Sequence, residues 1–346
     1  MIKNLRARTA LVLVGCLAVM MPLAVFSQKN PAKKTLVIKL ASLAPEATPW
    51  GAALNELALA WSKATGGDVE LRVYHNGMAG SEEDVLRKLK QNQLQAAVFT
   101  SLGMSQVSPA IMTLSVPFFI RTDAELNAVL GAIRGDLEAG IEQAGFKTIA
   151  WSKIGWVNFF SRNPVFTPQD LKKQKLASDS TLTAFNDAFS SMGYQLVLAT
   201  SNDIIMFLNS RRIDALYQSP INVATTQAFG IAKNMANIKV APFMGGIVMN
   251  DVTWRHIPEK YRSRLLALSA KTVANNEASI GALEDRAITE MKKHGLVVND
   301  LTDAQREEWY ADVNRVIPSL LGKTFDRDIY QKIDGILKTT RSAARR

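Results

Sequence analysis

An internal repeat constrains this fold most, because residues 163–218 follow the layout of residues 52–98 in the same order. Each copy contains an amphipathic helix, a glycine, a short alternating strand, a polar turn, a second helix and a second strand. Matching apolar positions differ by a constant offset of 119, with Leu86, Leu89, Leu94 and Ala96 against Ile205, Leu208, Ile213 and Ala215. The repeat predicts two similar α/β lobes that face each other across a ligand-binding cleft. The alternative is that any two βα units share this pattern.

Composition narrows the class of protein. A length of 346 residues and a hydrophobic content of 47% suffice for two domains that each bury a core. The formal charge is +10, and it falls to +7 without the three basic residues of the first 27 positions. The basic residues are scattered, and the only dense cluster is the tail with Arg341, Arg345 and Arg346. We therefore expect a solvated, mildly basic surface and no nucleic-acid partner.

The first 27 residues have the pattern of a secretory signal peptide. Lys3, Arg6 and Arg8 precede a continuous apolar run over residues 9–26, and a small-x-small site ends at Ser27. This pattern predicts export to the periplasm with cleavage after Ser27.

Two other fates of this segment stay open. Residues 13–16 fit a lipobox, which would place a lipid on Cys16. The apolar run also just reaches membrane-spanning length, so the segment could instead remain as an uncleaved membrane anchor. The run continues well beyond Cys16, which favours cleavage after Ser27 over lipidation. Because Cys16 is the only cysteine, we expect core packing rather than disulfides to stabilise the mature chain.

Helix and strand signals divide the rest of the chain. Helical signals include a helix over 51–65 that ends at Gly66-Gly67 and a relaxed capping box of Ser81 and Asp84. The further expected elements are a strand over 35–42, a strand over 95–101, two helices between 122 and 145, two strands within 146–162 broken at Gly155, a return crossing over 242–250 with backbone freedom at Gly245-Gly246, and helices over 261–293, 302–321 and 326–340.

Signals for an enzyme are poor. The three histidines fall in unrelated segments without metal-ligand spacing. The sequence contains no nucleophile elbow, zinc-protease motif, P-loop or dinucleotide fingerprint. We therefore expect no catalytic residues, no metal and no cofactor.

Several segments together carry a family resemblance. They are residues 50–67, 80–82, 117–119, 168–176 and 212–216. By their order and spacing, the chain resembles over residues 35–340 the solute-receptor subunit of TRAP transporters, the C4-dicarboxylate-binding receptor family. The resemblance implies an α/β two-lobe clam-shell of the periplasmic-binding-protein kind, with crossover strands and a helical C-terminal layer. It also implies hinge closure on a small-molecule ligand and delivery to membrane permease subunits.

This resemblance and the repeat give a domain division. Residues 1–27 are the signal peptide, residues 35–154 plus 247–283 form lobe I, and residues 155–246 plus 284–346 form lobe II with the helical back layer. A non-transport sensor or interaction protein could use the same clam-shell, and this alternative stays open. Sequence leaves the oligomeric state open.

One departure from the family concerns the ligand. In the family, the segment that corresponds to residues 170–176 is followed by an arginine that holds the ligand carboxylate through two parallel hydrogen bonds. Here Ala177 follows it, and residues 156–157 are Trp-Val where a second family arginine stands. Ala177 leaves room, while Trp156, Phe159 and Phe160 offer apolar surface, so we expect an apolar or weakly polar ligand rather than a simple dicarboxylate.

The alternative is that another cation replaces the missing arginine, with Lys153 and Arg121 as candidates. Arg162 lies in the loop before a proline turn and is a weaker candidate. At strand spacing, at least one of Trp156, Phe159 and Phe160 is expected in the core rather than in the cleft.

The remaining candidates lie where strands end toward the opposite lobe. In the family, an asparagine near the segment 217–222 contacts the ligand, although here Ser219 stands before Pro220. Each candidate has a structural role as its alternative. The full set of predicted ligand-binding residues is Trp50, Ser101, Trp156, Phe159, Ala177, Ser178, Tyr217, Ser219 and Asn222.

Overall fold

The protein is described from a computed structural model, which covers residues 35–180, 182–200 and 203–344. The expected signal peptide and the lipidation alternative at Cys16 lie outside the described residues. Within the described ranges, no helix has both the length and the apolarity needed to cross a membrane.

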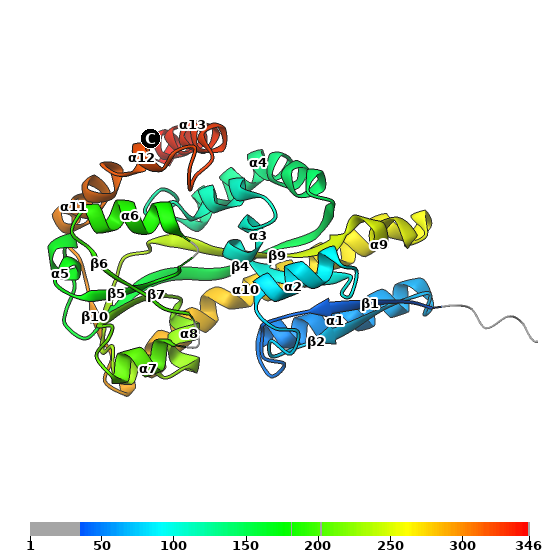
Figure 1. Cartoon of the computed structure of the whole chain (residues 1–346), viewed down its shortest axis with the longest axis horizontal. Helices are drawn as coiled ribbons and strands as arrows, with labels where there is room; N and C mark the ends of the chain where they lie inside the picture. Colours follow the sequence, from blue (N-terminus) through cyan, green and yellow to red (C-terminus); the bar gives the residue numbers. More distant parts are fainter. Residues whose placement is uncertain (1–34, 181, 201–202, 345–346) are drawn as a thin grey trace, which may run out of the picture. The chain divides into compact units, whose positions relative to one another are not determined.

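One mixed sheet runs through the described residues (Figure 1). Its main path has the order β2-β1-β3-β9-β4-β7-β5-β6, and two short strands, β8 and β10, pair beside β4. The strands are β1 (Leu36–Ala41), β2 (Val69–Tyr74), β3 (Ala96–Thr100), β4 (Phe146–Ser161), β5 (Lys175–Ser178), β6 (Gln195–Leu198), β7 (Ala215–Gln218), β8 (Asn234–Ala236), β9 (Ala241–Asn250) and β10 (Val297–Asn299).

Helices connect and cover these strands (Figure 1). They are α1 (Pro49–Thr65), α2 (Glu82–Lys90), α3 (Ser101–Ser105), α4 (Asp123–Gln143), α5 (Pro168–Lys172), α6 (Thr183–Ser191), α7 (Ile204–Asn209), α8 (Pro220–Thr225), α9 (Asp251–His256), α10 (Glu259–Lys293), α11 (Asp303–Asn314), α12 (Ile317–Leu320) and α13 (Arg327–Ala344), with 3₁₀ turns η1 (Pro109–Ser115) and η2 (Ala228–Gly230).

The internal repeat is present in the topology. The unit β1-α1-β2-α2-β3 and the unit β5-α6-β6-α7-β7 both place their strands in the order second, first, third. The third strand of each unit then pairs antiparallel with a long strand, β3 with β9 and β7 with β4. The sequence offset of 119 holds even at the helix caps, since Thr100 accepts a hydrogen bond from Gly103 N and Ser219 accepts one from Asn222 N.

Several local predictions are confirmed. Gly66 adopts a left-handed conformation at the end of α1, with φ of 60°. Ser81 and Asp84 form the capping box at the start of α2, with Ser81 Oγ accepting from Asp84 N at 3.2 Å.

The two expected helices between 122 and 145 are instead one helix, α4. Two of its three glycines, at positions 131 and 135, lie in open space, so they weaken the helix without breaking it. The apolar side chains between them and on either side form one stripe, and packing of this stripe against α13 overrides the local glycine cost. The stripe consists of Leu126, Val129, Ile133, Leu137 and Ile141.

The two strands expected within 146–162 are one strand, β4, whose register against β9 shifts between Lys153 and Gly155. Gly155 has φ of 147°, which disfavours any side chain, so the predicted break is a bulge inside a continuous strand. Gly245 and Gly246 of β9 have ordinary backbone angles. A Cβ on Gly245 would lie 2.7 Å from Phe99 O, so these glycines permit close packing rather than backbone freedom.

Helix α10 holds the bulge of β4 through two buried or half-buried carboxylates. Glu277 Oε1 accepts from Lys153 N at 2.5 Å, and Glu284 Oε1 accepts from Trp156 N at 2.8 Å. Burial raises the pKa of both carboxyl groups above their ordinary value of 4.5, while these backbone hydrogen bonds act in the opposite direction. The bulge therefore depends on hydrogen bonds to side chains that are costly to ionise.

Helix α13 packs beside the first repeat unit. Ile329, Ile333 and Leu337 join the apolar cluster that contains Leu86 of α2 and the α4 stripe. Arg341 Nε lies 2.8 Å from Glu125 Oε1 of α4. Ile205 of α7 packs against a different cluster, so the equivalent helices of the two units contribute to separate cores.

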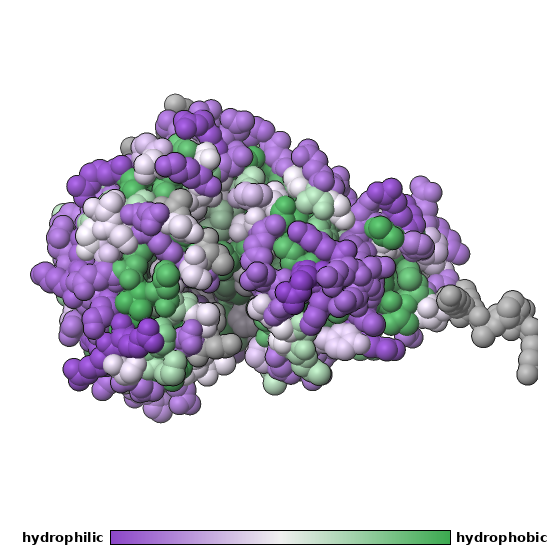
Figure 2. Space-filling model, in the orientation of Figure 1, coloured by the Kyte–Doolittle hydropathy of each residue, from purple (hydrophilic) through white to green (hydrophobic). Residues whose placement is uncertain are grey.

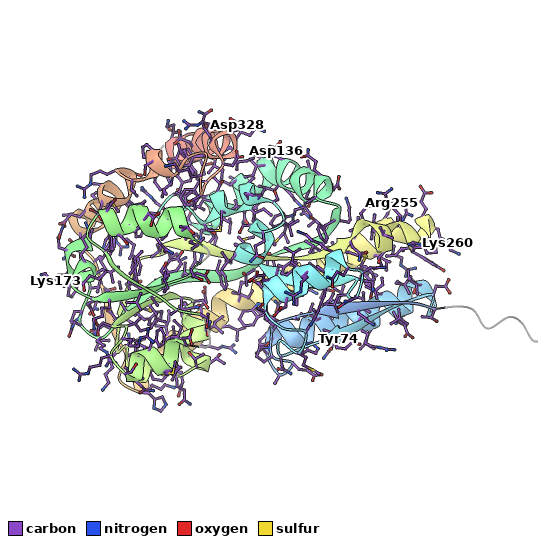
Figure 3. The ribbon with its side chains drawn as sticks, viewed as in Figure 1. Tyr74, Asp136, Lys173, Arg255, Lys260 and Asp328 are labelled. Carbon is purple, nitrogen blue, oxygen red and sulfur yellow. The ribbon has the colours of Figure 1, made fainter. Side chains whose placement is uncertain are left out.

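Charged side chains are spread over the periphery. Figure 3 labels Asp136, Lys173, Arg255, Lys260 and Asp328 on separate elements, and all five are exposed. This distribution matches the expected solvated surface, because no single face gathers the labelled charges.

We predict that Glu284→Gln gains stability relative to the wild type as pH rises. A raised carboxyl pKa in the folded state means that folding favours the protonated form, so its contribution is complete below the ordinary pKa and is lost as pH increases through the raised value. An amide still accepts from Trp156 N without ionising. The difference in Tm, variant minus wild type, should therefore grow between about pH 5 and about pH 8.

The exposed Glu308→Gln serves as the control for this measurement and should give no such trend. A Glu284→Gln difference that stays constant across that pH range would show that burial does not perturb this carboxyl group.

Candidate ligand-binding cavity

A cavity of about 310 Å³ lies where strands of both repeat units end. Its volume falls within the range of small-molecule sites. Figure 2 shows hydrophilic residues over much of the visible surface, which is hollowed near the middle, with apolar residues in the hollow. The described lining comprises Leu43, Glu82, Thr100, Ser101, Leu102, Met112, Ser115, Pro117, Phe118, Val157, Phe159, Leu176, Ala177, Ser178, Asp179, Leu182, Phe185, Phe189, Tyr194, Leu196, Ala199, Ile204, Leu216, Tyr217, Gln218, Val240, Pro242, Phe243, Trp309, Val313 and Phe325.

Aromatic rings form much of the wall. Phe159 of β4 stacks on Trp309 of α11 with ring centroids 5.2 Å apart, and its centroid lies 5.9 Å from that of Tyr217. On α6, Phe185 stacks on Phe189 at 4.1 Å. These rings offer flat apolar surfaces on which an apolar ligand can bury its own area.

Most polar groups of the wall are bound to neighbours in the protein. Ser101 Oγ donates to Met244 O at 3.0 Å, and Ser178 Oγ lies 2.5 Å from Asn186 Oδ1. Tyr194 Oη donates to Asp312 Oδ2 at 2.8 Å. These polar groups therefore shape the wall, because their hydrogen bonds to the protein already compensate their burial.

Burial raises the pKa of both tyrosines in the wall, and the Asp312 charge raises the pKa of Tyr194 further. The phenols therefore stay neutral at physiological pH. Asp312 in turn pairs with Lys172 Nζ at 2.9 Å, behind the wall. Lys172 is not part of the described lining, so its ammonium group pairs with Asp312 and does not face the ligand space.

The charged groups of the described lining are both carboxylates. Glu82 of α2 and Asp179, which follows β5, come from different repeat units. Burial raises the pKa of Glu82, and the negative charge of Asp179 adds to this rise. No lysine, arginine or histidine occurs in the described lining. This cavity therefore supplies no cationic partner for a ligand carboxylate.

Five of the nine predicted residues line this cavity: Ser101, Phe159, Ala177, Ser178 and Tyr217. They come from α3, β4, β5 and β7, so the structure brings both repeat units together at one place. Tyr217 is only half-buried by its neighbours because one side of its ring faces the cavity.

Trp156 lies in the core and not in the lining. Its side chain is 2% exposed, and Nε1 donates to Asp123 Oδ1 at 3.1 Å. Lys239 Nζ lies 4.8 Å from the centre of its ring. The bulge at Gly155 and strand alternation direct this ring away from the cavity, while Phe160 is also buried in the core.

Three other predicted residues lie outside the lining. Ser219 is 2% exposed and caps α8, and Asn222 Nδ2 donates to Gln218 Oε1 at 3.1 Å. Trp50 is half-buried at the start of α1, where its Nε1 is buried without a hydrogen-bond partner. Turn chemistry therefore explains Ser219 and Asn222 in this structure.

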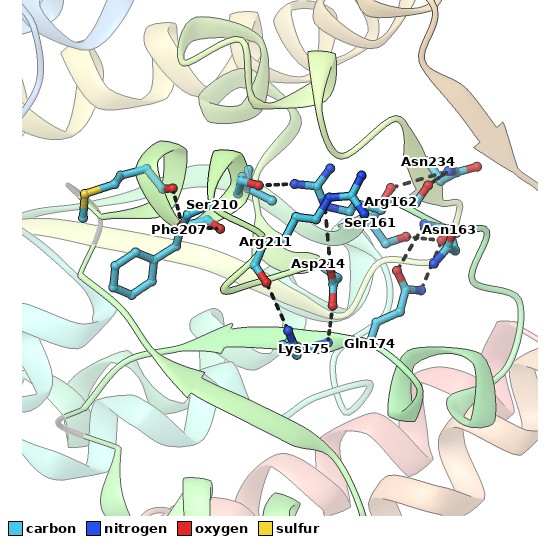
Figure 4. A network of polar contacts seen from close by, with 12 residues as sticks. Ser161, Arg162, Asn163, Gln174, Lys175, Phe207, Ser210, Arg211, Asp214 and Asn234 are labelled. Atoms are coloured by element: carbon cyan, nitrogen blue, oxygen red, sulfur yellow. Dashed lines mark hydrogen bonds and ion pairs between the residues drawn. The ribbon is translucent and has the colours of Figure 1, made fainter.

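The candidate replacement cations are engaged elsewhere. Lys153 Nζ lies 2.6 Å from Asp123 Oδ1, and Arg121 stacks 3.5 Å above the centre of the Tyr310 ring. Arg162 lies in a network with Asp214, 3.6 Å away, and donates to the backbone of Leu208 (Figure 4). None of the three lines the cavity.

Sequence reasoning missed the part of the lining that comes from the C-terminal layer. Trp309 and Val313 of α11 and Phe325 after α12 close one side of the cavity. Trp309 is 1% exposed and follows helical apolar spacing, so its pattern is that of a core residue. Pro117 and Phe118 also line the cavity, although the sequence marks residues 117–119 only as part of the family resemblance.

No group of three or more potential metal ligands occurs among the described residues. The described lining of the cavity is mostly apolar and carries two carboxylates, a composition suited to binding a small-molecule ligand.

Comparison with known proteins places this architecture in a family. Residues 40–323 match the family described as bacterial extracellular solute-binding protein, family 7. The chain is 22% identical over 307 residues to a C4-dicarboxylate-binding protein of Bacillus subtilis, which covers 86% of each chain. It is 26% identical over 249 residues to a 2,3-diketo-L-gulonate-binding periplasmic protein of Escherichia coli, covering 70% of this chain and 74% of that protein.

Solved structures give the same fold. A TRAP periplasmic solute-binding protein of Xanthobacter autotrophicus with bound β-D-galacturonate has a TM-score of 0.76 and 20% identity, covering 86% of this chain and 98% of that one. One from Shewanella oneidensis with bound succinate has a TM-score of 0.79 and 16% identity, covering 88% and 99%.

The chain belongs to the family of TRAP transporter solute receptors. Its fold is the α/β two-lobe clam-shell of periplasmic binding proteins, with β4 and β9 as crossover strands and helices at the C-terminus. This is a class of transport receptors that bind small molecules in the periplasm, and it is not a class of enzymes.

We predict that Trp309 reports on ligand binding, because it is the only tryptophan of the described lining. N-phenyl-1-naphthylamine, a neutral apolar dye, should bind in the cavity and receive excitation energy from Trp309. Because energy transfer falls steeply with distance, Trp309→Phe should lower it more than Trp254→Phe, a change outside the lining. Equal transfer in the two variants would place the dye elsewhere.

Proposed function

We propose that this protein is the receptor of a TRAP-type secondary transporter, and that it binds an apolar or weakly polar ligand rather than a simple dicarboxylate. The observation that carries the proposal is the described lining, which is rich in aromatic and aliphatic side chains and contains no lysine, arginine or histidine. Ala177, where the family resemblance implies an arginine, is part of this lining.

The energetics of this cavity favour an apolar ligand. Burying about 200 Å² of apolar surface contributes about 5 kcal/mol before the costs of association. A carboxylate that enters the same cavity loses its hydration and finds Glu82 and Asp179, which repel it. The solved relatives named above carry galacturonate or succinate, so this chain would differ from them in ligand class.

The proposed receptor works with membrane permease subunits and closes by hinge bending. We propose lobes of residues 35–154, 247–283 and 327–344 and of residues 155–246 plus 284–326. Compared with the division expected from sequence, α13 moves from the second lobe to the first because it packs on α4. Within the described residues, the strands of the sheet pass between the two proposed lobes at only two places. These are the bulge at Gly155 in β4 and the facing segment of β9. Ligand contacts from both lobes would stabilise the closed state.

We predict that titration calorimetry detects no binding of succinate or malate. Ala177→Arg should weaken dye binding about tenfold, since a guanidinium replaces apolar wall surface. Ala144→Arg, at an exposed position at the end of α4, is the matched control and should bind the dye as the wild type does. Tight binding of succinate by the unmodified protein would refute the apolar ligand class.

We also predict compaction on binding. The ligand that co-purifies with the protein can be identified by native mass spectrometry and added back at saturation. Small-angle scattering should then give a smaller radius of gyration than the ligand-free protein, because closure brings the lobes together. An unchanged radius at saturation would contradict hinge closure.

A further inference from the structure

The two carboxylates of the cavity lie on opposite repeat units. Glu82 begins α2, and Asp179 directly follows β5, two positions beyond Ala177. The two groups repel each other: burial raises the pKa of Glu82, and the negative charge of Asp179 raises it further. Both groups therefore border one space, with no lysine, arginine or histidine of the described lining between them.

Glu82 is held firmly in place by its own repeat unit. Its Oε1 accepts from Thr100 N at 2.5 Å, its Oε2 accepts from Thr100 Oγ1 at 2.8 Å, and Gly103 N also donates to the carboxylate. These donors orient both oxygens at the end of β3. The carboxylate is thus part of the built wall rather than a mobile surface group.

Aromatic rings form another part of the lining. Phe159, Trp309 and Phe189 lie in the stacked ring pairs described above, and none of them carries a charge. The described lining therefore carries negative charge from both repeat units and is uncharged and mostly apolar elsewhere.

We infer that the ligand is an amphiphilic cation, an apolar or aromatic body that carries a protonated amine directed at Glu82 and Asp179. The inference rests on the proposed receptor function and names its ligand class. Without a cation, bringing two like charges closer opposes lobe closure. A protonated amine between them reverses the sign of both interactions, so it stabilises the closed state selectively.

Asp179 is then a specificity-determining residue. Glu82 accepts hydrogen bonds from Thr100 with both carboxylate oxygens and supplies mainly charge, whereas Asp179 lies in the lining directly after β5, the strand that carries Ala177. Replacement of the Asp179 carboxylate by an amide should remove the selectivity for amines over neutral ligands with the same body.

The test compares three ligands that share one body. 4-Phenylbutylamine, 4-phenylbutan-1-ol and 4-phenylbutanoate are titrated against N-phenyl-1-naphthylamine bound to the full-length mature protein. We expect the amine to bind about tenfold or more tightly than the alcohol, and the carboxylate to bind weakest. Asp179→Asn should bring the amine to the affinity of the alcohol, and Glu82→Gln should reduce the preference in the same direction.

Asp187→Asn is the matched control, because Asp187 is an exposed carboxylate of α6 outside the lining. It should keep the wild-type preference. A cooperative thermal unfolding transition of Asp179→Asn, measured by circular dichroism, shows that this variant is folded.

Two outcomes would overturn the inference alone, with the apolar receptor left standing. These are an alcohol that binds as tightly as the amine, and an amine preference that survives in both Asp179→Asn and Glu82→Gln. A carboxylate that binds most tightly, or a dye that none of the three displaces, would overturn the proposed ligand class together with the inference.

Discussion

The antiparallel pairing of β4 with β9 is the interaction on which the rest of the structure depends. It runs from Phe146 opposite Asn250 to Val157 opposite Ala241, and each repeat unit joins one outer edge of this pair. Parallel strands in each unit end toward the centre, so the polar residues that follow β3 and β5 and the last residues of β7 gather at one cavity. The site is therefore a consequence of the pairing rather than of any local motif.

The same pair of strands carries an irregularity that the proposed lobe movement would use. A bulge at Gly155 interrupts the ladder, and α10 satisfies the backbone donors on both sides of it through Glu277 and Glu284. Ionising a buried carboxyl group costs free energy, so the net stabilisation from these two side chains falls as pH rises, although the ionised form is the stronger hydrogen-bond acceptor. In the proposed closure, this crossing segment keeps its strand pairing while its backbone angles adjust.

How far the sequence predicts this structure depends on the range of the interactions involved. The repeat, the Gly66 helix end and the Ser81 capping box are local or periodic signals, and all are present. The division of α4 was wrong because a long-range stripe against α13 outweighs two glycines.

Long-range packing also limits what can be predicted of the cavity. Ala177 and Phe159 were found from strand ends and from a missing arginine, and both line it. Trp156 lies in the core because it is three positions from Phe159 in one strand, and strand alternation places the two side chains on opposite faces. Trp309 was missed because a tryptophan on an apolar helix face has the same pattern in a core and in a cavity wall.

Under the proposed ligand class, one fold changes its ligand without changing its architecture. The sheet order and the helix caps depend on backbone pairing and on the cap residues, and Ala177 contributes to the cores only as a half-buried neighbour of one apolar cluster. A small side chain at 177 leaves room in the cavity, while a carboxylate at 179 repels a carboxylate ligand. Because both positions border the cavity, substitutions there can change the ligand while the sheet order stays the same.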